Sequence, residues 1–185
     1  RSHEIPTIMK TVFDGSIPCF FKGVSVAFLE RFVKENHHEV RFLSTDAVVE
    51  RLIKPRTASQ FEGDPGSAKT TGRTFFERIH EKWRQDGPCA GPGAKMVFIS
   101  HAWRQTFHVS KSDNPYRGGV AEAIIDSVDE SERQHTFIWF DIFCVNQHLD
   151  NPYGGLLAFA FDPLRNAIEE SDHVKLILEK WDDPG

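Results

Sequence analysis

The second half of the sequence predicts an α/β fold with a parallel sheet. Three short apolar runs, at residues 96–99, 136–145 and 174–178, are typical of strands buried on both faces. Helical patterns at residues 120–128 and 162–171 separate these runs. Strands that alternate with helices pair in parallel, because right-handed crossovers bring each strand back in the same direction with the helices on the sheet faces.

The strand assignments rest on residue type. Met96–Ile99 is a continuous apolar run that follows a turn-forming segment. The run from Thr136 to Val145 is the strongest strand signal in the chain, because it is rich in β-branched and aromatic residues, although Asp141 interrupts it. Residues 174–178 form the third apolar run.

The two helices between the strands have recognisable faces and ends. Asp162 followed by Pro163 starts the second helix, because Asp is a favoured N-cap and Pro suits the first helical position. This helix is expected to end near Ser171. One apolar face marks the first helix, at Val120, Ile124, Ile125 and Val128.

Residues 4–93 are predicted to form a helical region that precedes the α/β domain of residues 94–185. A Gly- and Pro-rich segment at residues 87–93 suits neither a helix nor a central strand, so it marks the boundary. The elements expected before it are a helix from Val24 to about Asn36, a short strand at residues 40–43, a helix that Ser44 or Thr45 caps and Pro55 ends, a polar loop at residues 56–73, and a helix from Thr74 to about Gln85. The helix between Ser44 and Pro55 carries the apolar residues Val48, Val49, Leu52 and Ile53.

Composition limits the classes of function. The formal net charge is −5, whereas proteins that hold nucleic-acid phosphates are usually basic. No apolar run approaches the roughly 20 residues that span a bilayer, and no basic-then-apolar leader opens the sequence. The three cysteines lie far apart, which favours reduced thiols and a cytoplasmic protein. Neither a CxxC nor an HExxH pattern indicates a metal site.

Polar and aromatic side chains follow each predicted strand, at the strand end where parallel sheets bind their ligands. These three tails are therefore expected to meet in one rim and to form the main polar pocket. Rings that stack on a base, together with polar groups that hold ribose and phosphates, suit a nucleotide. The candidate residues are Ser100, His101, Trp103 and Arg104 after the first strand, Asp141, Phe143, Asn146, Gln147 and His148 after the second, and Trp181 after the third.

The same tails carry a family resemblance. Residues 97–103, Val-Phe-Ile-Ser-His-Ala-Trp, resemble the first strand and loop of Toll/interleukin-1 receptor (TIR) domains, in the form seen in TIR-like proteins of microbes and protists. Residues 137–148, Phe-Ile-Trp-Phe-Asp-Ile-Phe-Cys-Val-Asn-Gln-His, resemble the second strand and functional loop of a protist and algal TIR-like group. Residues 166–178 and 181–184 resemble the next helix and strand, so the likeness covers roughly residues 95–185.

The resemblance implies a flavodoxin-like fold and an intracellular signalling role. It implies either self-association, with a second copy or another TIR-like domain, or cleavage of NAD at its nicotinamide bond, with no required cofactor. The NAD-cleaving members use a glutamate in a Trp-Cys-x-x-Glu setting on the helix after the third strand. Glu169, Glu170 and Glu179 do not match that motif, and the sequence ends at Gly185, before that helix. We therefore assign no catalytic residue and expect this C-terminally incomplete domain to release no nicotinamide.

The candidate residues also have structural interpretations. His101 and Trp103 would equally pack a loop against the sheet, and Asp141 would equally cap backbone amides. Cys144 is expected to be a buried, inert thiol. Two other functions stay open at this point. One is a protein-interaction module without a small-molecule ligand, and the other is a metal- or thiol-dependent hydrolase built on His101, Asp141, Cys144 and His148.

The third strand is expected to leave an open sheet edge. In a flavodoxin-like order the second strand lies at one edge, the first beside it and the third on the other side. No later strand in the sequence covers residues 173–179, whose two faces both carry apolar side chains. Residues 5–13 or 40–43 would cover this edge, or two copies would pair there. We favour self-association, which the charge of Lys175 opposes.

Overall fold

The computed structural model describes residues 23–57, 94–109, 118–145, 147, 165 and 167–178. Its helices and strands are, in chain order, β1 (Val24–Ser25), α2 (Val26–Glu35), α3 (His37–Val40), α4 (Thr45–Val48), the π-helical turn η2 (Val49–Ile53), α5 (Lys54–Thr57), β2 (Lys95–His101), α7 (Val120–Ile125), the 3-10 turn η3 (Glu130–Glu132), β3 (Thr136–Trp139), α8 (Asp141–Cys144) and β4 (His173–Ile177). The expectations on residues 5–13, 58–93 and 179–185, and on the helix start at Asp162, lie outside the described residues.

The protein has an α/β fold built on a mixed four-stranded sheet in the order β1-β3-β2-β4. Strand β2 pairs in parallel with both β3 and β4, so the predicted neighbours and direction of these three strands are confirmed. The expectation of a wholly parallel sheet with the second strand at its edge is wrong, because β1 pairs antiparallel with β3.

Strand β1 consists of two residues, the first of which was expected to begin helix α2. Ser25 has an extended backbone and its hydroxyl accepts a hydrogen bond from the amide of Phe28 at 3.1 Å, so α2 begins only at Val26. Val24 and Ser25 are left extended beside Ile138 and Phe137 of β3. The helix otherwise follows the prediction and ends with Asn36 as its C-cap.

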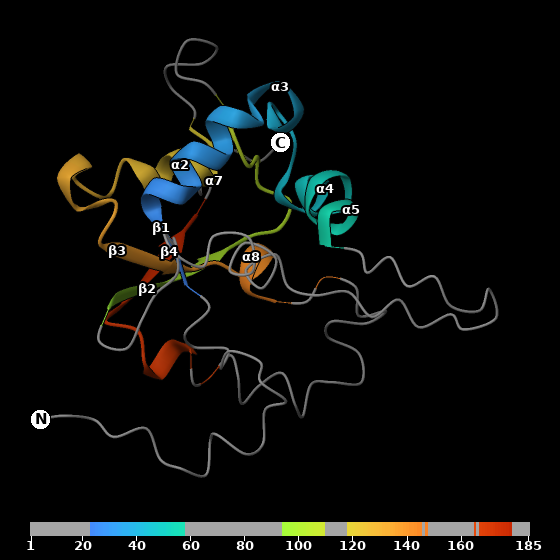
Figure 1. The fold of residues 1–185 in the computed structure, drawn as a ribbon. Coiled ribbons are helices and arrows are strands. Elements are labelled where there is room, and N and C mark those ends of the chain that lie inside the picture. The colour runs from blue at the N-terminus through green and yellow to red at the C-terminus, as the bar shows by residue number, and fades with distance from the viewer. Residues whose placement is uncertain are drawn as a thin grey trace, which may run out of the picture.

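Helices cover both faces of the sheet. Helices α2 and α7 lie together on one side, and the helical residues 167–169 lie on the other (Figure 1). Right-handed crossovers require this arrangement, because β3 and β4 flank β2 on opposite sides. The β2 residues Val97, Ile99 and His101 therefore alternate with residues that face the opposite layer.

The second predicted strand is shorter than expected. It ends at Trp139, and Asp141–Cys144 forms the helical turn α8, in which the amides of Phe143 and Cys144 both donate to the carbonyl of Phe140. The apolar run over residues 136–145 fits a strand followed by a buried turn equally well, because every side chain of the turn that follows Asp141 faces the core.

Two further expectations in the N-terminal region are wrong. Residues 40–43 form no strand of the sheet, since Val40 ends α3 and the segment after it makes only isolated bridges. Pro55 does not end the helix that precedes it. The proline lies in the first turn of α5, directly after the π-helical turn η2. In η2 the backbone hydrogen bonds follow the wider π-helical pattern in place of the regular α-helical one.

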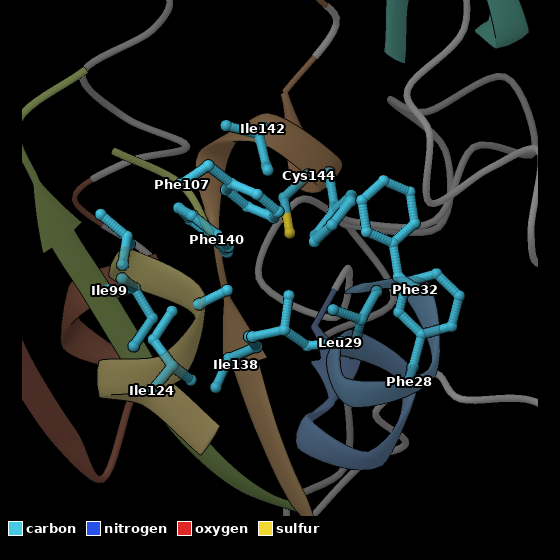
Figure 2. Packing of buried hydrophobic residues seen from close by; sticks show 14 of the residues in the cluster. Phe28, Leu29, Phe32, Ile99, Phe107, Ile124, Ile138, Phe140, Ile142 and Cys144 are labelled. Atoms are coloured by element: carbon cyan, nitrogen blue, oxygen red, sulfur yellow. The ribbon is translucent and has the colours of Figure 1, made fainter. Parts of the chain in front are cut away.

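One core joins both halves of the described chain. Phe32 of α2 meets Phe143 and Phe107 edge to face, with ring centroids 5.2 and 6.2 Å apart, and Phe140 stacks on Phe107 (Figure 2). Leu29 and Ile138 lie beside this aromatic cluster (Figure 2). Such edge-to-face pairs add to the stabilisation from apolar burial. The predicted boundary at residues 93 and 94 stays a prediction.

Strand β4 has apolar side chains in contact with solvent. Val174, Leu176 and Leu178 are 57%, 60% and 69% exposed, whereas Ile177 faces the core. No strand among the described segments pairs with the outer edge of β4. None of the described helices is long and apolar enough to cross a membrane.

Candidate functional site

The tails of β2 and β3 meet at the carboxyl end of the sheet. The indole Nε1 of Trp103 donates a hydrogen bond to Oδ2 of Asp141 at 2.9 Å. The ring of His101, the last residue of β2, meets Phe140 edge to face at 4.9 Å between centroids. We call His101, Trp103 and Asp141 the rim cluster.

His101 is a buried histidine with an unused hydrogen-bonding atom. Its side chain is 1% exposed, and Nε2 is buried with no hydrogen-bond partner among the described residues. Burial lowers the pKa of His101 to about 4, because a charged imidazole would lose its hydration. The ring is therefore neutral at neutral pH, with one nitrogen able to donate and the other able to accept.

Asp141 is the second unusual group of the rim cluster. It is the first residue of α8, and its side chain is 19% exposed. Burial raises the pKa of Asp141 to about 6, against the smaller opposing effects of the Trp103 hydrogen bond and the amide of Ile142. Its Oδ1 is buried and has no hydrogen-bond partner in the part of the chain that the structure describes; Nδ1 of His101 is 3.9 Å away, which is too far for a hydrogen bond.

The rim cluster therefore presents a carboxylate oxygen and an imidazole nitrogen that no described residue satisfies. A buried polar atom without a partner is unfavourable by about 1–3 kcal/mol, so such atoms are uncommon in folded proteins. Strained or unsatisfied groups with shifted pKa values concentrate at binding and catalytic sites. Hydroxyl or N–H groups of a ligand would satisfy Oδ1 of Asp141.

The other predicted residues have separate placements. Phe143 is fully buried in the aromatic cluster, so its ring has no surface for a ligand. Ser100 is half-buried, one residue before His101 and therefore on the opposite face of β2. Gln147 is buried and donates from Nε2 to the carbonyl of Asp141 at 3.0 Å, which braces α8. Cys144 is buried in the core, as expected.

Arg104 is exposed. The Ser44 hydrogen bond is the main cause of the lowered pKa of Asp46, and the charge of Arg104 adds the smallest of the contributions that lower it. The remaining candidates, Asn146, His148 and Trp181, lie outside the described residues.

The loop after β2 is held by the segment between α3 and α4 and by the first turn of α4. The amides of Asp46 and Thr45 donate to the carbonyls of Trp103 and Gln105 at 3.0 and 2.9 Å. Further along, the Phe107 amide donates to the carbonyl of Leu43 at 2.7 Å. We call residues 102–109 the rim loop.

Phe42 adopts a strained conformation in the segment between α3 and α4. Its φ is +60°, in the left-handed region that bulky residues rarely occupy. This turn lets the Phe42 amide donate to the carbonyl of His108 at 3.0 Å, while the guanidinium of Arg41 lies 4.7 Å from the Phe42 ring centroid. Such strain persists only where surrounding contacts compensate it, and it is a pointer to function.

Sequence reasoning missed a chain of three polar side chains behind the rim loop. Nδ1 of His37 lies 2.8 Å from Nε2 of His108, and Nδ1 of His108 hydrogen-bonds Oε1 of Glu122. His37 is half-buried. The position of Glu122, three residues after Gly119 at a helix start, is a capping signal that would have placed its carboxylate near the N-cap. No spacing rule links the two histidines.

Within the described ranges, no three His, Cys, Asp or Glu side chains form a group that could hold a metal ion. The expectation that the rim forms the main polar pocket is not confirmed: a pocket of about 480 Å³ lies toward the amino ends of the strands, where its lining includes Lys95, Thr136 and His173. The candidate site is defined instead by the hydrogen-bonding atoms of the rim cluster and by the half-buried Trp103 ring. Comparison of the chain with protein-family models, with curated proteins and with solved structures gives no match.

Proposed function

We propose that the rim cluster is the nucleotide-binding site of a TIR-like signalling module with a flavodoxin-like arrangement of strands, and that its ligand is of the NAD type. The observation that carries the proposal is the pair of unsatisfied buried atoms, Oδ1 of Asp141 and Nε2 of His101, at the carboxyl ends of two parallel strands. Ligands of open parallel sheets bind at that end.

The chemistry of the rim cluster suits the sugar and ring parts of such a ligand. An ionised Asp141 has one oxygen for a ribose hydroxyl, because the other accepts from Trp103. The half-buried indole of Trp103 offers a surface for stacking, and Arg104 is an exposed cation for phosphate. None of the described residues matches the catalytic glutamate motif, so the proposal is binding without nicotinamide release.

Titration with NAD and with ADP-ribose, followed by the indole N–H resonance of Trp103, tests this proposal. We expect saturable shifts in the native protein, and binding at least about tenfold weaker in Asp141→Asn, since a hydrogen bond to a charged group is lost. Asp129→Asn is the matched control, because Asp129 is exposed and lies outside the rim cluster. Absence of any saturable shift in the native protein would refute the proposal.

The exposed apolar residues of β4 favour a second candidate function. Val174, Leu176 and Leu178 lie on one face of an edge strand, which tends to recruit another strand. We infer that this edge supports self-association or binding of another TIR-like domain. A cytoplasmic location would accompany either function, since the buried thiol of Cys144 suits a reducing compartment.

Light scattering across a concentration series tests the edge. The native protein is expected to gain mass with concentration, and Leu176→Lys is expected to abolish that gain, because a charge on an edge strand discourages pairing. Ile168→Lys is the control, since Ile168 is 40% exposed on a helical segment. A native protein that remains monomeric at the highest concentration would exclude this second function.

A further inference from the structure

The chain of Glu122, His108 and His37 connects three separate parts of the fold. His37 lies in α3, Glu122 lies in the first turn of α7, and His108 belongs to the rim loop between β2 and α7. The side chains of His108 and Glu122 are 7% and 13% exposed. Polar groups buried this deeply rigidify a structure when all their hydrogen bonds are made.

The carboxylate sets the direction of every hydrogen bond in the chain. Oε2 of Glu122 accepts from the amides of Gly119 and Val109, at 2.9 and 3.2 Å. Its Oε1 accepts from Nδ1 of His108, so a His108 ring that carries a single proton has its lone pair on Nε2. That lone pair would accept from Nδ1 of His37, which lies 2.8 Å away. With one proton on each ring, the arrangement requires the Nδ1–H tautomer of both histidines.

The same backbone segment links this chain to the rim cluster. The His108 carbonyl accepts from Phe42, and the Phe107 carbonyl accepts from the amide of Ala121 at 2.9 Å. Trp103 lies four residues before Phe107 in the same loop, and its indole N–H donates to Asp141. A shift of His108 away from Glu122 would therefore move the loop that carries a rim residue.

We propose that Glu122, His108 and His37 form a positioning relay that fixes the rim loop, and through it the orientation of Trp103 toward Asp141. None of the three residues belongs to the rim cluster, so they act on a ligand only through the loop. The effect on ligand binding rests on the proposed nucleotide site, whereas the effect on the loop does not.

Nitrogen-15 NMR of the imidazole rings tests the relay directly in the native protein. His37 and His108 are each expected to show the Nδ1–H tautomer, with exposed His38 as an internal reference. The isosteric change Glu122→Gln sharpens the test. The Gln oxygen should stay on the two backbone N–H groups of Gly119 and Val109, so the N–H₂ group faces His108, whose Nδ1 must then accept and lose its proton. A proton on Nε2 of either ring in the native protein overturns the relay.

Side-chain variants separate a relay from a merely structural contact. His37→Leu should speed amide exchange of Phe42 and Phe107 about tenfold or more, because one bond of the relay is lost. His37→Gln should restore protection, since its amide N–H can still donate to His108. Glu132→Gln changes an exposed residue outside the relay and should have no effect. Equal exchange in His37→Leu and the native protein would overturn the proposal.

A ligand titration distinguishes this inference from the proposed function. If the native protein binds NAD or ADP-ribose, His37→Leu should weaken binding and His37→Gln should not. If the native protein binds neither, the nucleotide proposal fails, while the tautomer and exchange results still decide the relay. Binding that is unchanged in His37→Leu despite a loosened loop would limit the relay to the loop and remove its role in positioning Trp103.

Discussion

Replacement of the Asp141 carboxylate by an amide is expected to stabilise the protein at neutral pH. Burial raises the pKa of Asp141 to about 6, so this carboxyl ionises less readily in the folded chain than in the unfolded chain. Asp141→Asn keeps the shape of the side chain and an oxygen for the Trp103 hydrogen bond, and it removes the charge. The variant thus tests whether the charge at the rim cluster is unfavourable for folding.

The magnitude follows from the pKa difference. One pKa unit corresponds to about 1.36 kcal/mol, so a rise from 3.8 in the unfolded chain to about 6 in the folded chain corresponds to about 3 kcal/mol. Because the folded-state pKa is the higher one, the unfolded chain releases its proton first as the pH rises. Folding stability falls between about pH 4 and pH 6, and the full penalty is present at pH 7. The gain in Asp141→Asn should therefore be about 3 kcal/mol at pH 7 and below about 1 kcal/mol at pH 4.

In the native protein, His101 offsets the pH dependence of folding stability that Asp141 causes. Burial lowers the pKa of His101 to about 4, so the unfolded chain takes up a proton below about pH 6.5 that the folded chain resists. The stability from a neutral His101 is complete above that pH and is lost toward pH 4, which is opposite in sign to the effect of Asp141. The two effects nearly cancel. The native protein should show a flat profile from these groups, whereas Asp141→Asn should lose about 3 kcal/mol on acidification.

Urea unfolding at pH 4 and pH 7, followed by far-UV circular dichroism, measures both quantities. Asp129→Asn is the control, because Asp129 is exposed and its side chain caps no helix. A variant that is less stable than the native protein at pH 7 would show that the folded state favours the charge. A gain of equal size at both pH values would show that it arises from packing and not from ionisation.

Three further changes test the fold and the rim. Trp103→Phe removes the hydrogen bond that opposes the raised pKa of Asp141; the pKa should rise further, as carbon-13 NMR of the carboxyl group across pH would show, and an unchanged value would contradict the role given to Trp103. Phe140→Ala should lower the free energy of unfolding by about 3–5 kcal/mol in urea, because the ring is fully buried; a loss below about 1 kcal/mol would place the ring outside the core. Gly119→Ala should lower the free energy of unfolding by about 1–3 kcal/mol, because a Cβ there would lie 2.6 Å from the carbonyl carbon of Phe107 and 2.7 Å from the amide nitrogen of His108. An unchanged midpoint of thermal unfolding would contradict this close contact.

Elements whose side chains alternate between the two covered faces of the sheet were predictable from the sequence. The continuous apolar run of β2 and the helical period of α7 indicated the type and approximate position of each element. The parallel direction of three strands followed from crossover handedness, and their order followed from the flavodoxin-like arrangement that the resemblance implied. The run ending at Val145 could not be divided, because Ile142, Phe143 and Cys144 are buried whether they lie in a strand or a helical turn.

The candidate site was predictable only where it depends on strand ends. His101, Trp103 and Asp141 were found because parallel strands end at a common edge. The contacts of His37 with His108 could not be found in this way, because they depend on where α3 packs against a loop 71 residues later in the sequence. Propensity and periodicity describe neighbours along the chain and contain no information on such tertiary pairs.

The two-residue strand β1 limits how many copies of the chain can join through the sheet. A sheet with two long free edges can add strands at both ends and grow without limit, as in a fibre. Here β1 occupies the outer side of β3 and is itself too short to serve as a template, so among the described strands only β4 offers an edge. If two copies pair through β4, each has used the one edge that its described strands leave open. The assembly then closes as a dimer with two-fold symmetry.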